Sequence, residues 1–534
     1  ATMVILLATD FSVAQDKELS IKDAVIGQWR ELYPETISRL NWIPGSNTYY
    51  FMDGNKLKKS SPESAEETTI YNLEKLNALL GLTEKKNKIK RFPRFSWLDQ
   101  KTLQIKHRAK RYQINPYENQ LIDSVTIDNN AENIDYTEVG NRFAYTIENN
   151  LFISDYDGNK IQITHEKNPE IVYGKEVHRR EFGINTGTFW SPKAKKLAFY
   201  KKDESMVTDY PLVDITTRVA DLKNEKYPMA GMKSHHVKVG IYDLATGETH
   251  YLQTGKPSEK YLTNVAWGPN GAYVYVAELN RDQDHMKMNQ YDAHTGEHVK
   301  TLFEEKDEKY VEPQTPIQFL PGSDSRFIWT SRRDGYNHIY LFNTNGELIK
   351  QLTKGNWEVN NDFIEFDKTG EFLYFSANKQ SPVEQHTYKI NIKSSDIYLL
   401  TKDEGFHSSK LNNGAGYIID NYSHMDNPRT IQIIDTEGKV VKELLQAEDP
   451  LKNYNLGEAE INTIKTADGE TDLYYRLIKP ADFNPDKEYP AIIYVYGGPH
   501  AQLVQNRWLG SARMWQYYMA QKGYVMLTID NRGS

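Results

Sequence analysis

A short segment near residue 496 holds residue types that can stabilise a negatively charged oxygen. The apolar run 489–496 ends in Gly497 and Gly498, and glycines let a backbone pass close to a reacting carbonyl group. The hydroxyl of Tyr496, the last residue of the run, could donate a hydrogen bond to the oxyanion that forms when an acyl group is attacked. The pattern predicts an oxyanion-binding loop in which Tyr496 is the side-chain donor.

The groups that would complete acyl-transfer chemistry are missing from the 534 residues. The sequence contains no Gly-x-Ser-x-Gly motif, which often surrounds the serine nucleophile of enzymes that carry out acyl transfer. Ser534 is interpreted as a turn residue, and His500 as a loop residue, since nothing supplies it with a nucleophile. We expect the nucleophile, acid and base to lie beyond Ser534, and the chain as given to be inactive on its own.

The elements around this loop predict the opening of an α/β fold over residues 456–534. Segments 461–469 and 473–480 resemble an antiparallel hairpin, and 489–496 is a continuous apolar run typical of a strand buried on both faces. A helix is expected over 512–522, followed after Gly523 by a further buried strand at 524–529. Strand, turn, helix and strand in this order are typical of an α/β domain.

A different pattern recurs between residues 40 and 455. An aromatic or glycine residue precedes a turn and an alternating strand, with starts at positions 42, 97, about 140, 190, 267, 319, 366 and about 414. Most spacings are about 43 to 55 residues, which is typical of β-propeller blades because each blade buries its faces against its neighbours. Two stacked β-sandwiches are the alternative. The interval from 190 to 267 is longer, so it must contain an insertion.

Five short polar turns support the repeat. They are Asp155–Gly158, Asp243–Gly247, Asp292–Gly296, Asn343–Gly346 and Asp435–Gly438. An Asp or Asn followed by Gly is typical of hairpins, since Gly adopts positive φ at little cost. The sequence therefore predicts a mainly β protein: an eight-bladed β-propeller followed by the first part of an α/β domain.

Composition excludes several function classes. The net charge of −8 and the pI near 6.0 argue against a nucleic-acid partner. The absence of cysteine excludes disulfides, thiolate zinc sites and a cysteine nucleophile, and neither a metal nor a cofactor is expected, since His235, His236 and His285 form no ligand motif. Residues 1–14 are interpreted as the remnant of a signal peptide, which indicates export to the periplasm or the cell surface.

Several motifs together carry a resemblance to a known family. They are Phe189–Pro192, Lys226–Gly231, Asp334–Ile339, Thr353–Val359, Tyr496–Pro499 and Asp530–Ser534. In this order they resemble the dipeptidyl peptidase IV branch of the prolyl oligopeptidase family. The resemblance implies a propeller that caps an α/β-hydrolase domain, with residues 15–39 belonging to the hydrolase. It also implies a homodimeric serine exopeptidase that acts on peptides with a free N-terminus and a nearby proline.

The resemblance also implies an anchor for the substrate's ammonium group. Members of the dipeptidyl branch carry two adjacent glutamates before a blade's Trp-Ser-Pro. Here Glu181 stands at the second position and Arg180 at the first, with Glu176 as a fallback. A single glutamate is similar to the prolyl tripeptidyl peptidases of the family, which favours release of tripeptides over dipeptides.

Two other functions remain open at this point. A non-catalytic propeller with a degenerate hydrolase tail would bind peptides or proteins, although the retention of Tyr496, Gly497 and Gly498 argues against degeneration. An endopeptidase or acylaminoacyl-releasing enzyme would cleave N-blocked substrates equally well, which an ammonium anchor at Glu181 should prevent.

Overall fold

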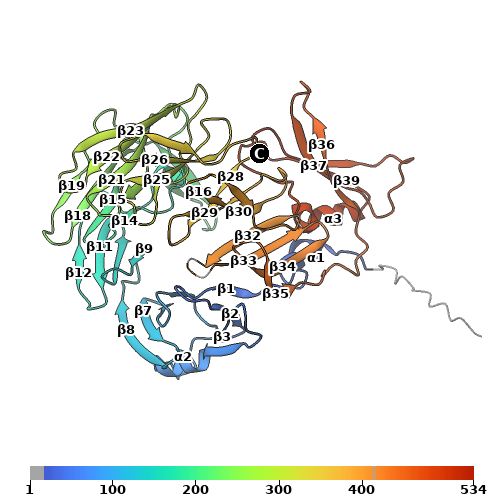
Figure 1. Ribbon diagram of the computed structural model, residues 1–534, viewed down its shortest axis with the longest axis horizontal. Helices are drawn as coiled ribbons and strands as arrows, with labels where there is room; N and C mark the ends of the chain where they lie inside the picture. The colour runs from blue at the N-terminus through green and yellow to red at the C-terminus, as the bar shows by residue number, and fades with distance from the viewer. Residues whose placement is uncertain (1–16, 413, 415) are drawn as a thin grey trace, which may run out of the picture.

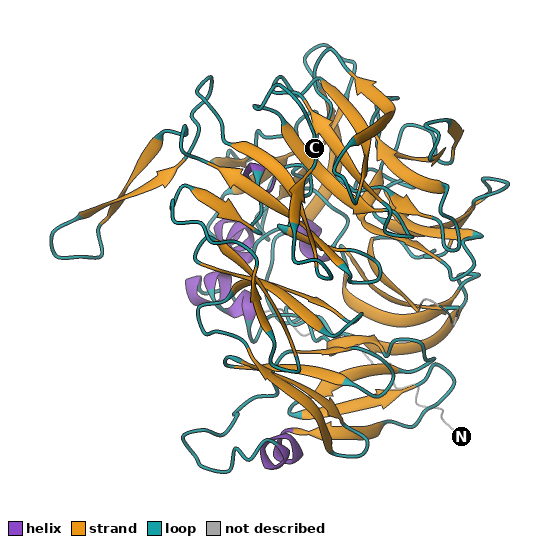
Figure 2. Ribbon diagram, turned by 90° about the vertical axis from the view of Figure 1, so that its left-hand side faces the viewer, coloured by secondary structure: helices purple, strands orange, loops and turns teal. Residues whose placement is uncertain are grey.

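Strands are the main regular structure of the described residues, and the helices among them are few and short (Figure 2). The computed structural model describes residues 17–412, 414 and 416–534, so the predicted signal-peptide remnant at 1–14 lies outside them. No helix within these ranges combines the length and the apolar character needed to cross a membrane.

Eight antiparallel sheets follow one another along the described chain, and all but the fourth have four strands. The first four consist of β1 (Ser38–Trp42), β2 (Tyr49–Asp53), β3 (Lys56–Ser60) and β4 (Thr68–Asn72); β5 (Phe95–Trp97), β6 (Leu103–His107), β7 (Lys110–Asn115) and β8 (Gln120–Thr126); β9 (Glu132–Thr137), β10 (Arg142–Ile147), β11 (Asn150–Asp155) and β12 (Lys160–Gln162); and β13 (Ile171–Tyr173), β14 (Thr188–Trp190), β15 (Lys196–Asp203), β18 (His236–Asp243) and β19 (Thr249–Tyr251).

The next four sheets repeat the simple pattern. They consist of β20 (Tyr261–Trp267), β21 (Tyr273–Leu279), β22 (His285–Asp292) and β23 (His298–Lys306); β24 (Gln318–Phe319), β25 (Arg326–Ser331), β26 (His338–Asn343) and β27 (Leu348–Gln351); β28 (Val359–Phe366), β29 (Phe372–Ala377), β30 (His386–Asn391) and β31 (Ile397–Leu399); and β32 (Phe406–Asn412), β33 (Tyr417–His424), β34 (Asn427–Asp435) and β35 (Val440–Gln446). The helix α2 (Leu73–Leu79) follows the first sheet.

The local signals read from the sequence are found where they were expected. The tryptophans of the repeat, Trp42, Trp97, Trp190 and Trp267, are the last residues of the strands β1, β5, β14 and β20. The five polar turns each join the last two strands of a sheet, and their glycines all have positive φ. The long interval after Trp190 contains an additional hairpin, β16 (Asp209–Asp214) and β17 (Asp221–Lys226).

Buried apolar clusters lie between the sheets rather than within them. Of the nine clusters found among the described residues, seven each join two sheets that are consecutive in sequence. An eighth joins the last sheet to the first through residues such as Trp42 and Ile433. Apolar burial is the main favourable term in folding, so each sheet is stabilised by both of its neighbours, and the arrangement is consistent with a β-propeller.

Side chains close the ring between β1 and β32. The indole of Trp42 donates a hydrogen bond to the carbonyl oxygen of Lys410 at 2.9 Å, and the Lys410 ammonium donates to the carbonyl oxygen of Leu40 at 2.8 Å. The first and last sheets lie side by side in Figure 1, where blue β1 meets orange β32 and β33. Within the described chain the two sheets share no strand, so side-chain packing and these bonds hold the first and last sheets together.

A ninth sheet of a different type follows the ring. Its strands are β36 (Ala459–Lys465), β37 (Asp472–Ile478), β38 (Ala491–Tyr494) and β39 (Val525–Ile529), in the order β36-β37-β39-β38. The strands β38 and β39 are parallel, and η3 (Trp508–Ser511) and α3 (Met514–Gln521) lie between them in sequence. A parallel pair with an intervening helix is the connection found in α/β folds.

The prediction that 489–496 is buried on both faces is wrong for the structure described. The strand β38 lies at the edge of its sheet, where β39 is its one partner among the described residues. Its residue Ile493 is 64% exposed, and Val495, which follows the strand, is 57% exposed. The physical reason is position: a strand at a sheet edge has one paired side, and α3 packs against only one face of β38, through Ile492 and Tyr494, so the face that carries Ile493 is left uncovered by the described residues.

The N-terminal segment packs against this ninth sheet. It contains α1 (Ile21–Val25) and η1 (Gly27–Trp29), and Leu19, Ala24 and Leu32 share an apolar cluster with α3 and β39. The backbone N–H of Leu19 donates to the Gln521 side chain at 2.7 Å. The two ends of the described chain therefore form one unit beside the ring (Figure 1).

Candidate functional site

Glu181 lies on an excursion that interrupts the fourth sheet. The strands β13 and β14 both pair with β15, and residues 174–187 leave the sheet between them. The excursion packs against β20 of the next sheet, where Val177 and Ile184 join one inter-sheet cluster and Phe182 joins another. These buried anchors fix the base of the segment that carries Glu181.

The backbone of this excursion is strained. His178, Arg179, Arg180 and Phe182 have φ values of 51°, 55°, 67° and 59°, a left-handed conformation that costs a residue with a side chain roughly 1 kcal/mol or more. Such strain persists where the surroundings enforce it, and it concentrates at functional sites. The run of strained residues leads directly to Glu181.

Two buried histidines hold the strained backbone. The side chain of His235 accepts at Nε2 from the His178 backbone N–H at 3.3 Å and from His178 Nδ1–H at 3.0 Å. The Nε2 atom of His178 accepts in turn from the Leu262 backbone N–H at 3.2 Å. Both rings must be neutral to accept these bonds, and burial lowers the pKa of His235 to about 4 and that of His178 well below its ordinary value.

The two candidate glutamates differ in whether they are already paired. Glu176 accepts two bonds from the Arg180 guanidinium, at 2.6 and 3.0 Å. Partial burial opposes the change, but these bonds lower the pKa of Glu176. Glu181 is exposed, and its carboxylate forms no ion pair or hydrogen bond with any side chain the structure describes. Of the two, Glu181 is the carboxylate that is free to bind a cation.

Tyr496 lies just beyond the C-terminal end of β38, the edge strand of the ninth sheet. It follows β38, and 55% of it is exposed. A Cβ atom placed on Gly498 would lie 2.7 Å from a ring carbon of Tyr496, whereas one on Gly497 would meet nothing within 4 Å. A side chain at position 498 would therefore displace the phenol, while position 497 borders open space.

One loop of the propeller contacts both predicted site segments. A Cβ atom on Gly183 would lie 2.0 Å from the carbonyl oxygen of Gln314, so the excursion presses against residue 314. Two residues earlier, the Glu312 carboxylate lies 2.8 Å from His500 Nε2. His500 is four residues beyond Tyr496. The segments of Glu181 and Tyr496 thus meet the same short stretch of chain.

Two of the three histidines considered as possible metal ligands form side-chain contacts within the fold. His285 pairs with Glu304 at 2.7 Å, and His235 belongs to the pair described above. No cluster of three or more His, Cys, Asp or Glu residues suited to a metal was found among the residues described. The histidine pair was not predicted, since His178 and His235 are 57 residues apart and no local motif joins them.

Three comparisons with known proteins agree on a family. Residues 97–429 match the family model described as "Dipeptidyl peptidase IV (DPP IV) N-terminal region". The chain is 41% identical to a candidate dipeptidyl aminopeptidase IV from Bacteroides ovatus, whose crystal structure matches with a TM-score of 0.89 over 97% of this chain and 75% of that one. The crystal structure of Porphyromonas gingivalis dipeptidyl peptidase 4 matches with 23% identity and a TM-score of 0.80 over 97% and 74%, which shows a shared fold.

Curated relatives are similar over part of their length. The "probable dipeptidyl-aminopeptidase B" of Talaromyces marneffei is 29% identical over 73% of this chain and 47% of its own. The protein of the same name from Emericella nidulans is 28% identical over 77% and 49%. The chain thus spans about half the length of the curated relatives it matches. With a family model that covers most of the ring of sheets, the chain belongs to the dipeptidyl peptidase IV family.

Proposed function

We propose that the full-length protein is a serine exopeptidase that releases short peptides from the N-terminus of its substrates by cleaving after proline. The observation that carries the proposal is the free carboxylate of Glu181, held on a strained excursion that contacts the same loop as the Tyr496 segment. An ammonium ion that leaves water needs a charge-assisted partner, and in this proposal the Glu181 carboxylate would supply it.

In this proposal the propeller has eight blades, and residues 456–534 begin an α/β-hydrolase domain. The order β36-β37-β39-β38, with one parallel pair and a helical crossover, supports this reading. The association of α1 with α3 supports assigning the N-terminal segment to the same domain. The serine, acid and base would come from chain beyond Ser534.

In this proposal Glu181 and Tyr496 have different roles in the reaction. Glu181 would bind the substrate's ammonium group, and the distance from there to the reacting carbonyl would set the length of the peptide released. Tyr496 would donate its hydroxyl proton in a hydrogen bond to the developing oxyanion. Because Arg180 is paired with Glu176, one carboxylate remains as anchor, and we favour release of tripeptides over dipeptides.

Two further parts of the proposal concern assembly and location. The hairpin β16–β17 projects apolar side chains into solvent, among them Val213, Ile215 and Leu222, which are 61%, 82% and 63% exposed. Exposed apolar surfaces of this kind are typical of association sites, so we propose that the hairpin contributes to a homodimer. The signal-like residues at the N-terminus are the basis for proposing export to the periplasm or cell surface.

The test of the proposal is hydrolysis by the full-length protein of matched p-nitroanilides that end in proline and contain two or three residues. We expect the tripeptide substrate to give the higher kcat/KM. Glu181→Ala should raise KM about 100-fold for free-amine substrates, the scale of a charge-assisted bond, and leave an N-acetylated substrate unchanged. Glu297→Ala, at an exposed turn of the fifth sheet, is the control. Equal losses for both substrates would remove Glu181 from the anchoring role.

A second substitution tests the oxyanion loop. Tyr496→Phe removes the hydroxyl and keeps the ring, so we expect kcat to fall by about 100-fold or more, as when one oxyanion donor is lost. KM for the same substrate should change little. A kcat near that of the wild type would contradict the role of Tyr496, and no hydrolysis of any substrate by the wild type would favour a non-catalytic peptide-binding propeller.

A further inference from the structure

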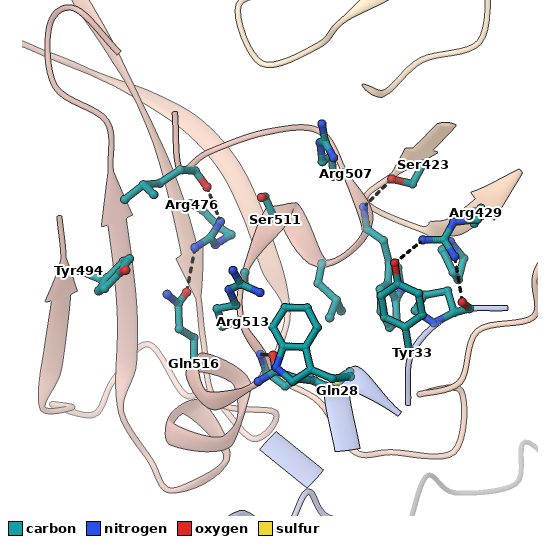
Figure 3. Close-up of a pocket in the computed structure, with 18 of the residues that line it drawn as sticks. Gln28, Tyr33, Ser423, Arg429, Arg476, Tyr494, Arg507, Ser511, Arg513 and Gln516 are labelled. Atoms are coloured by element: carbon teal, nitrogen blue, oxygen red, sulfur yellow. Dashed lines mark hydrogen bonds between the residues drawn. The ribbon is translucent and has the colours of Figure 1, made fainter. Parts of the chain in front are cut away.

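A cavity with an excess of positive charge lies between the N-terminal segment and the ninth sheet. Its volume is about 500 Å³, and four arginines line it: Arg429, Arg476, Arg507 and Arg513 (Figure 3). None of its lining residues is Asp or Glu. Within the described chain none of these arginines forms a salt bridge, although four arginines elsewhere do. The cavity lining therefore contains no opposite charge.

Arg476 is the most deeply buried of the four, with 2% of it exposed. Its terminal nitrogens donate to neutral groups, namely the carbonyl oxygens of Leu503 and Gly510 and the side chains of Gln516 and Thr528. Its Nε–H has no partner among the residues described. A buried charge that lacks an opposite charge is expensive, and this burial lowers the pKa of Arg476 to about 10.

Asp530 is the carboxylate that attracts Arg476 from nearby. It does not line the cavity, and its oxygens accept bonds at 2.9 Å from the backbone N–H groups of Leu503 and Val504. It forms no hydrogen bond with Arg476 and acts on that guanidinium only through space, from outside the cavity lining.

Two other arginines are held by aromatic faces. The guanidinium of Arg507 stacks 3.5 Å from the centre of the Phe406 ring, and that of Arg513 lies 4.6 Å from the ring of Trp29. The Nε atom of Arg507 is buried and unpartnered among the described residues. Stacking uses the face of a guanidinium and does not neutralise its charge, so both side chains are held in place with their positive charge intact.

Arg429 has a different role. It donates to the carbonyl oxygens of Pro34 and Glu35, both at 2.9 Å, and to the hydroxyl of Tyr33 at 3.1 Å. These bonds attach the N-terminal segment to β34 and form one wall of the cavity, on the right of Figure 3.

The start of α3 adds to the positive potential. Arg513 is the N-cap residue, no side chain caps the helix, and its first turn contains no acidic residue. The N-terminus of a helix carries a partial positive charge and unpaired N–H groups, so it favours anions. This feature and the unpartnered buried arginines point independently to the same kind of ligand.

We propose that the cavity binds a small organic anion that carries two or more carboxylate or phosphate groups. Its volume lies within the range of small-molecule sites and exceeds what a single phosphate needs. The N–H edges of Arg507 and Arg513 bind the ligand's charged groups, and Arg476 supplies the potential behind them. The site does not depend on the proposed peptidase activity.

Titration calorimetry of the full-length protein tests the proposal. Citrate is the organic probe, inorganic phosphate is the single-group probe, and trimethyl citrate is the uncharged analogue. We expect citrate to bind more tightly than phosphate and trimethyl citrate not to bind. Arg513→Gln, which leaves the buried groups intact, should weaken citrate binding about 10-fold or more, the scale of one charge-assisted bond.

Arg218→Gln is the matched control, because it removes the same charge from an exposed loop of the β16–β17 hairpin, and citrate should bind it as it binds the wild type. The proposal is overturned if neither anion binds, if the control loses as much affinity as Arg513→Gln, or if phosphate binds as tightly as citrate. A structure of the full-length protein with one of its own carboxylates filling the cavity would also overturn it.

Discussion

Two segments depart from the four-stranded pattern within the fourth sheet, and they are built in opposite ways. The excursion 174–187 buries its anchors, with Val177 at 1% and Phe182 at 4% exposure. The hairpin β16–β17 leaves Ile215 and Val219 at 82% and 79% exposure. The excursion is packed into two inter-sheet cores, whereas the hairpin stands outside all nine described clusters.

The backbone follows the same division. Within 174–187, four residues other than glycine have positive φ, whereas the hairpin strands and their turn have none. Left-handed residues are tolerated when buried partners enforce them, as the His178–His235 pair does here. The two segments touch where the Arg179 guanidinium lies 4.6 Å from the ring of Tyr227. One segment thus holds a fixed conformation for Glu181, and the other presents a surface.

The largest effect expected is that of Gly183→Ala. A Cβ atom there would lie 2.0 Å from the Gln314 carbonyl oxygen, and φ is +72°. Overpacking against backbone and a left-handed alanine together should lower the free energy of unfolding by about 3 kcal/mol. Chemical denaturation of the full-length protein measures this change, and hydrogen exchange should show reduced protection across 174–187.

Gly231, which follows the hairpin, is the matched position. It has φ of +77°, but an added Cβ atom would meet nothing within 4 Å. Gly231→Ala should therefore cost only the left-handed conformation, about 1 kcal/mol. If the two variants lose similar amounts of unfolding free energy, the excursion can move away from Gln314, and it is packed less tightly against that residue than the structure indicates.

The two segments should also respond to acid in different pH ranges. Burial lowers the pKa of His235 to about 4, below its ordinary value of about 6.5. As the pH falls, His235 therefore binds a proton more readily in the open excursion than in the closed one. Protection of 174–187 should fall as the pH drops from about 6.5 to about 4. In the hairpin, the bond from Lys223 lowers the pKa of Asp214 to about 2. The contribution of this carboxylate to the stability of the hairpin is therefore complete above about pH 4 and is lost as the pH falls from there to about 2. Hydrogen exchange at several pH values, corrected for intrinsic rates, separates the two ranges.

A variant tests the contribution of His235, one of the two buried histidines here whose pKa is lowered. Glutamine at position 235 can accept hydrogen bonds from His178 but does not titrate, so His235→Gln should shrink the loss of protection between pH 6.5 and 4. An unchanged pH profile in this variant would assign the transition to another group. Lys202 and Arg281 also lower the pKa of His235, but they remain charged throughout this range.

Much of the ring could be predicted from the sequence, because its signals are local. The tryptophan that ends an early strand of a sheet and the Asp-to-Gly or Asn-to-Gly turn before its last strand each lie within a few residues, and both recur along the chain. The 77-residue interval between two starts predicted an insertion, since it is too long for a four-stranded sheet, and the structure shows that the insertion contains the β16–β17 hairpin.

The site could be predicted only in part, because its contacts are long-range. Glu181 and Tyr496 were identified as candidates from motifs, but their common neighbour, the 312–314 stretch, is distant from both in sequence. The strain in the excursion has no sequence signal, since arginine and histidine rarely adopt positive φ. The exposure of β38 was mispredicted for a related reason: an apolar run shows which residues favour burial, but not which element covers them.

The smallest effect on stability is expected in the hairpin, and it sharpens the comparison most directly. Ile215→Glu and Val219→Glu together place charges where side chains already face solvent, so the free energy of unfolding should change by at most about 0.5 kcal/mol. If the hairpin forms part of a homodimer, the same charges would be buried without partners and would weaken association. Light scattering coupled to size-exclusion chromatography of the full-length protein should then show a shift from dimer to monomer at a fixed concentration. An unchanged mass would separate the exposed apolar surface from dimerisation, while a large loss of stability would mean that the hairpin packs against the ring after all.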